Sequence, residues 1–206
     1  MARTTRTPEE TRALILQAAA RLIRQQGPTV SLAAIAKEAQ VSKGGLLYHF
    51  PTKDDLLHGL VTEFVQRFRT QVEREDERSG DASPGHLTRA YIRAIFAGVH
   101  DPGALHDELA LAAHLLSEPE LREVTQRDAA RWREQLHADG LPEHTVRLII
   151  AATDGSSSGP LWGAILTTED LKHLERDLLA LTYPEEPTVT SYSVTAPSPT
   201  RNTPTA

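Results

Sequence analysis

Cysteine is absent from this chain of 206 residues, so neither a disulfide nor a thiolate metal site can form. Aromatic residues make up only 5% of it, which leaves leucine and alanine to build most of the core. No apolar run approaches the ~18 residues that a membrane span needs, and the N-terminus lacks the apolar core of a signal peptide. We therefore expect a cytoplasmic protein with no membrane partner.

Strand signals are missing as well, because no stretch combines sustained two-residue alternation with a strand-forming composition. Apolar residues instead recur at helical spacing, which predicts an all-α fold. The expected helices are one that ends at Gly27-Pro28, two short ones at 31–39 and 42–50, and longer ones at about 52–78, 87–99, 104–116, 120–137, 142–154 and 168–181. The segment Gly155–Pro160 is either a kink or a short loop. Residues 183–206, rich in proline, serine and threonine, are expected to form a disordered tail.

The two short helices carry the most informative pattern. Ser31 and Ser42 are good N-caps, and the tight link between the two helices is typical of a helix-turn-helix, at about residues 31–50. Lys43 lies at the positive end of the second helix dipole, and Gly44 and Gly45 weaken that helix. This combination makes sense if an external anion docks there, since free amides and Lys43 would bind it. We interpret the anion as a nucleic-acid phosphate.

The run from Arg12 to Leu60 resembles the N-terminal domain of TetR-family transcriptional regulators, and Val41 to Leu56 follows that family's signature almost position by position. One departure is Leu47, where many relatives carry an aromatic residue facing DNA; leucine could touch a thymine methyl there. The residues expected at or near DNA are Ser31, Ser42, Lys43, Gly44, Gly45, Tyr48, His49 and Lys53.

The resemblance implies the remaining organisation. It predicts a three-helix DNA-binding domain at 1–53, followed at 54–182 by a larger helical domain for ligand binding and dimerisation. It implies a homodimer that binds double-stranded, near-palindromic operator DNA and is most simply a repressor released by a small-molecule effector. In relatives, the region of Gly155–Pro160 forms a four-helix dimer interface with the final helix. No enzyme activity, cofactor or metal is expected.

Charge is distributed in agreement with DNA binding. The whole chain carries a formal net charge of −6, which alone argues against a nucleic-acid partner. Residues 1–53, however, contain eight Lys and Arg against three acidic residues, a local charge of +5. The basic region therefore coincides with the helix-turn-helix.

An effector pocket of the TetR type would need apolar lining with a few polar anchors. The candidates are Phe96, His100, Leu109, His114, Leu116, Trp132, Asp154 and Trp162. For each of them, ordinary packing in a helical core is the competing interpretation, although a buried indole needs a polar partner.

Three alternatives stay open at this stage. His100, His106 and His114, with the nearby Asp101, Asp107 and Glu108, could bind zinc or nickel and make a metal-responsive regulator of the same fold, although an exposed helix face explains them more simply. An enzyme is disfavoured, since the Gly-x-Ser-x-Gly pattern at 155–159 has no strand before it. A helical protein-interaction module would leave the basic first turn at Lys43 unexplained.

Overall fold

Helices form all of the regular structure in the computed structural model, which describes residues 6–115, 118–161, 163 and 165–183. Within these ranges the helices are α1 (Pro8–Gln26), α2 (Leu32–Glu38), α3 (Lys43–His49), α4 (Lys53–Ser79), α5 (His86–Val99), α6 (Pro102–Leu115), α7 (Pro119–His137), α8 (Glu143–Ser158) and α9 (Thr168–Ala180). The all-α prediction is confirmed. None of these described helices is long and apolar enough to cross a membrane. Leu116, Trp162 and the expected tail after Tyr183 lie outside the described residues.

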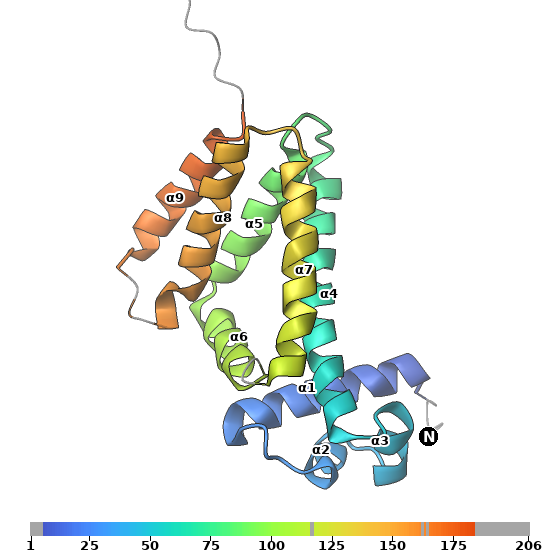
Figure 1. Cartoon of the computed structure of the whole chain (residues 1–206). Coiled ribbons are helices and arrows are strands. Elements are labelled where there is room, and N and C mark those ends of the chain that lie inside the picture. The colour runs from blue at the N-terminus through green and yellow to red at the C-terminus, as the bar shows by residue number, and fades with distance from the viewer. Residues whose placement is uncertain (1–5, 116–117, 162, 164, 184–206) are drawn as a thin grey trace, which may run out of the picture.

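The first three helices gather into a head at one end of the molecule (Figure 1). Thr7 opens α1 with a capping box that includes Glu10, and Gly27 ends the helix with a positive φ of 78° that suits glycine. Apolar residues at helical spacing on α1 meet those of α2 and α3 in a shared interior. Its fully or almost fully buried members include Ile15, Ala19, Ile23, Ile35, Ala36, Leu46 and Phe50.

The interior of the head does not end with α3. Leu56, Leu57 and Leu60 at the start of α4 belong to the same cluster, as do Leu111 and Leu115 of α6 and Leu121 of α7. Helix α6 also reaches α1 through a polar contact, because Arg24 Nε lies 3.5 Å from Asp107 Oδ2. The head is therefore joined to the rest of the chain by shared apolar packing and by an ion pair.

Helix α4, 27 residues long, leaves the head and runs along α5 and α7 through the length of the body (Figure 1). Two apolar clusters fill the body. One contains the rings of Phe68, Tyr91 and Trp132, whose centroids are 5.3–5.7 Å apart, and the other joins Phe96 and Ile92 of α5 to Ile149 of α8 and Leu178 of α9. Helix α5 is thus the central element against which α4, α8 and α9 pack.

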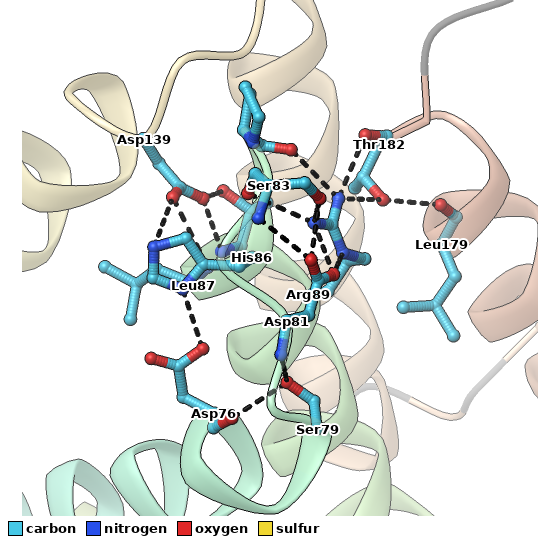
Figure 2. A network of polar contacts seen from close by, with 12 residues as sticks. Asp76, Ser79, Asp81, Ser83, His86, Leu87, Arg89, Asp139, Leu179 and Thr182 are labelled. Carbon is cyan, nitrogen blue, oxygen red and sulfur yellow. Dashed lines mark hydrogen bonds and ion pairs between the residues drawn. The ribbon is translucent and has the colours of Figure 1, made fainter.

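A polar network at the far end of the body ties α4, α5, the α7–α8 turn and the end of α9 together (Figure 2). Gly85, the N-cap of α5, offers no side chain, and Asp139 from the α7–α8 turn caps this helix instead. Its carboxylate accepts hydrogen bonds from Thr88 N and Thr88 Oγ1, both at 2.7 Å, and from Leu87 N at 3.3 Å. The side chain of Asp139 is only 3% exposed, so this cap is shielded from water.

Arg89 and His86 complete the network (Figure 2). Arg89 is 1% exposed, and its guanidinium donates to Asp81, Ser83 and the carbonyl oxygen of Thr182. His86 bridges two helix ends, with Nδ1 2.8 Å from Asp76 Oδ1 and Nε2 3.7 Å from Asp139 Oδ1. The hydrogen bond to Asp76 raises the pKa of His86, and burial opposes the shift.

The segment Gly155–Pro160 is resolved as neither of the two predicted forms. Helix α8 was expected to end near Asp154 but continues through Gly155 to Ser158, and a single 3₁₀ turn follows over Gly159–Leu161. The hydroxyl groups of Ser156, Ser157 and Ser158 each donate to the carbonyl four residues earlier, at 2.8–2.9 Å. Because proline cannot continue a helix, the break falls at Gly159-Pro160, directly after the last residue of α8.

Candidate functional site

The expected DNA-reading helix is α3, and its first turn is built as the sequence predicts. Ser42 caps it by accepting a hydrogen bond from Gly45 N at 2.9 Å, and Ser31 caps α2 in the same way from Ala34 N at 3.2 Å. Lys43 and Gly44 are exposed, while Gly45 is half-buried. A Cβ added to Gly45 would lie 3.2 Å from Ser42 Oγ, so part of the reason for this glycine lies within the head.

One face of α3 is buried and the other is free. Leu46 is fully buried, and Leu47 is half-buried against the core of the head. Tyr48 is 80% exposed and meets the ring of His49 edge-on, with centroids 5.1 Å apart. The exposed aromatic side chain of this helix is therefore Tyr48, whereas the side chain of Leu47 packs against the apolar interior of the head.

Lys53 begins α4 directly after this surface. Thr52 caps α4 through a capping box with Asp55, which fixes the start of the helix. Exposed Ser31, Ser42 and Lys43 come from the starts of two helices, and half-buried Lys53 adds a cation from a third. Helix starts and cations both favour phosphate oxygens.

The predicted pocket residues do not converge on one site. His100 lines a groove of about 570 Å³ between α8 and α9, and its Nε2 lies 2.9 Å from Glu175 Oε2. Phe96 is fully buried in a core cluster, and His114 packs near Gly27 of α1. In the described residues these candidates line different spaces, because α5, α6 and α7 turn different faces to different neighbours, and their role in effector binding stays a prediction.

Two of the candidates do share a site. Trp132 and Asp154 line a groove of about 620 Å³ between α7 and α8, which we call the lateral groove. Burial raises the pKa of Asp154. Burial also raises the pKa of Tyr91, to about 12, and the nearby charge of Asp154 adds to this shift. Arg69 contacts two residues that line the lateral groove: it forms an ion pair with Asp128, and its guanidinium lies 4.5 Å from the ring centroid of Trp132.

Leu109 lies in a different space, a cavity of about 280 Å³ where α4, α5 and α6 meet, which we call the central cavity. It is lined mainly by apolar side chains and by four polar residues. The apolar lining includes Phe64, Phe68, Ile95, Val99, Leu105, Leu109 and Ala112, and the polar residues are Arg67, Gln71, Glu108 and Ser157. Phe68 also lines the lateral groove, so this residue contacts both spaces.

Glu108 is the residue that sequence reasoning about the pocket missed. It lies at helical spacing with Leu105, Leu109 and Ala112, so a carboxylate stands within an apolar stripe. That irregularity was a usable signal, but the neighbouring histidines drew Glu108 into the metal hypothesis instead. Burial raises its pKa, and the charge of Arg67 lowers it by less.

The histidines do not assemble with the acidic residues into a metal site in the described part of the chain. No three His, Asp or Glu side chains there lie close enough together to hold an ion. Of the six candidate ligands, His100 faces Glu175 of α9 and Asp107 faces Arg24 of α1. These side chains therefore connect helices to one another.

Comparison with known proteins follows this division into head and body. Residues 15–60 match the family model described as bacterial regulatory proteins of the tetR family. Residues 85–183 match the model of a tetracyclin repressor-like C-terminal domain. Uncharacterized HTH-type transcriptional regulators of Mycobacterium tuberculosis and Mycobacterium bovis are 33% identical over 156 residues, which cover 69% of this chain and 76% of theirs.

Solved structures agree. The multidrug binding protein EbrR, crystallised with malachite green, is 27% identical and superposes with a TM-score of 0.62 over 84% of this chain and 98% of its own. A TetR-family member from Streptomyces coelicolor A3 is 27% identical, with a TM-score of 0.61 over 85% of this chain and 99% of its own. The chain therefore belongs to the TetR family of DNA-binding transcriptional regulators, which are not enzymes.

Proposed function

We propose that the protein is a repressor that acts in the cytoplasm as a homodimer on a near-palindromic operator and is released by a small molecule in the central cavity. One observation carries this proposal, the double role of α6. Leu105, Glu108 and Leu109 line the cavity, while Leu111 and Leu115 on the same helix complete the interior of the head. A ligand that displaces α6 therefore acts on the packing of the head.

The head, residues 1–53 in our proposal, would read DNA with α3. Lys43, Gly44, Tyr48 and His49 would lie at or near the major groove, with Gly45 allowing close approach of the backbone. Ser31, Ser42 and Lys53 would contact phosphates and set the position of the head on the duplex. The exposure of Tyr48 and Lys43, beside the buried Leu46, supports this orientation of α3.

Dimerisation would use the outer surface of α8 and α9 in the 54–182 domain. Leu148, Ala151 and Gly155 form an exposed apolar stripe on α8, and Leu181 is 51% exposed at the end of α9. A short reading helix contacts few base pairs, so paired half-sites would supply the remaining specificity. Leu148→Lys should give monomers by light scattering, whereas Gln126→Lys, at an exposed site on α7, should leave the dimer intact.

Release would follow from differential affinity. If the ligand binds more tightly to a dimer whose heads do not match the half-site spacing, it lowers operator affinity by that ratio, and DNA lowers ligand affinity equally. The ion pair between Arg24 and Asp107 and the apolar contacts of Leu111 and Leu115 supply the physical link between cavity and head.

The test combines a first ligand with a variant that fills the cavity. Malachite green is a sensible first ligand because the similar protein EbrR was crystallised with it. Gly98 lines the central cavity, and a Cβ there would meet nothing within 4 Å, so Gly98→Leu can occupy the space without a clash at its first atom. Ala97→Leu, on the exposed face of the same helix, is the matched control.

We expect Gly98→Leu to bind operator DNA as the unaltered protein does in fluorescence anisotropy, but to lose release by the ligand. Ala97→Leu should keep both properties. Ligand-driven release that is unchanged in Gly98→Leu would show that the effector site lies elsewhere. Release by zinc or nickel, but by no organic molecule, would favour a metal-responsive regulator.

A further inference from the structure

The polar residues that line the central cavity offer a ligand more hydrogen-bond acceptors than donors. Gln71 Nε2 already donates to Ala94 O at 3.0 Å, and Ser157 Oγ already donates to Thr153 O at 2.9 Å. What these two side chains leave for a ligand is mainly oxygen lone pairs, and the carboxylate of Glu108 adds more. Arg67 is the one cationic side chain among the lining residues, and it is exposed. The cavity is therefore suited to a ligand that donates hydrogen bonds.

Glu108 is a carboxylate with little compensation in the described structure. The side chain is half-buried on α6, and no hydrogen bond or ion pair joins it to another residue in the described ranges. Burial raises its pKa because an ionised carboxylate loses hydration there, and Arg67 compensates only in part. A cation brought next to Glu108 would replace the lost hydration and stabilise the ionised form.

We propose that the effector is an organic cation, an amine or ammonium group on an apolar body, with Glu108 as its counter-ion. This inference rests on the proposed role of the central cavity as the effector site. The apolar body would pack among Leu105, Leu109 and Val99, and the rings of Phe64 and Phe68 in the lining add faces that attract cations. The lining therefore combines apolar surface for the body with a carboxylate for the charge.

The position of Glu108 also connects recognition of charge to the head. The preceding residue on α6, Asp107, is the one that contacts Arg24 of α1. Two successive carboxylates thus face different partners, the first the DNA-binding head and the second the cavity. Attraction of Glu108 toward a bound cation would act on the helix segment that holds this ion pair.

The experiment compares three probes of similar size and different charge. They are 2-phenylethylamine, 2-phenylethanol and phenylacetate, which are a cation, a neutral molecule and an anion at neutral pH. Binding is measured by calorimetry for the unaltered protein and for Glu108→Gln, which keeps the shape of the side chain and removes its charge. Glu73→Gln, at an exposed site on α4, is the control.

We expect the amine to bind about tenfold more tightly than the alcohol, a preference that disappears in Glu108→Gln and persists in Glu73→Gln. The affinity for the amine should also rise with pH as Glu108 ionises, while that for the alcohol stays constant. Equal affinities for amine and alcohol, tighter binding of phenylacetate, or no binding of the amine at millimolar concentration would each overturn the proposal.

The outcomes separate the two proposals. If the probes bind without a charge preference and Gly98→Leu abolishes their binding, the central cavity remains the effector site and the cationic effector is wrong. If Gly98→Leu leaves both probe binding and ligand-driven operator release unchanged, the cavity is not the effector site and both proposals fail.

Discussion

Replacing Asp139 by alanine should destabilise the body without touching the DNA-binding surface. The substitution removes the acceptor of three hydrogen bonds, from Leu87 N, Thr88 N and Thr88 Oγ1, in a place where Thr88 is fully buried. Each unsatisfied buried donor costs about 1–3 kcal/mol, and loss of a helix cap alone costs about 1 kcal/mol. Allowing for relaxation, we expect a loss of about 3 kcal/mol in the free energy of unfolding.

In a chain of this length such a loss lowers the melting temperature by about 6–12 °C. Urea denaturation and thermal melting followed by circular dichroism measure it, with Asp177→Ala as the control because Asp177 lies exposed on α9. Asp139→Asn keeps one acceptor oxygen and should recover part of the loss. A change below about 1 kcal/mol for Asp139→Ala would refute the view that this carboxylate caps α5.

Three further predictions address DNA binding and pH. Lys53→Ala should weaken binding to all DNA sequences alike and reduce the salt dependence of affinity by about one unit, as salt titrations will measure; a loss limited to one operator variant would contradict this. Gly44→Ala should leave the melting temperature unchanged or slightly raised, because the added Cβ meets only Ser42 Oγ at 4.0 Å, yet weaken operator binding; equal affinity would mean that this glycine is merely tolerated. Folding raises the pKa of His86 above 6.5, so the protonated imidazole stabilises the folded state. This stabilisation is complete below pH 6.5 and is lost as the pH rises through the raised pKa. The difference in melting temperature between the unaltered protein and His86→Gln should therefore shrink from about pH 6 to pH 8.

Helix positions followed from sequence wherever apolar spacing and end signals agreed. Ser31 and Ser42 predicted N-caps that the structure contains. The predicted end of α8 was wrong because Gly155 weakens a helix without ending it, and the break comes only at Gly159-Pro160.

The candidate site divides in the same way. The surface of α3 could be predicted because it depends on neighbours within one short segment. The cavity could not, because its lining combines Phe64 and Phe68 of α4 with Glu108 of α6, and which faces meet is decided by how long helices pack. Asp139 was also missed, since a cap donated from 51 residues away has no local signature.

The shared interior of the head also limits how this regulator can be recombined. Exchange of DNA-binding modules between regulators would be simplest at residue 53, where α4 begins. A cut there leaves Leu111, Leu115 and Leu121 in the recipient body, although they complete the apolar interior of the donor head. A functional hybrid must therefore carry these three leucines, or side chains of equal volume, along with the new head. The packing of the DNA-binding head therefore depends on side chains of α6 and α7, which lie outside the head in the sequence.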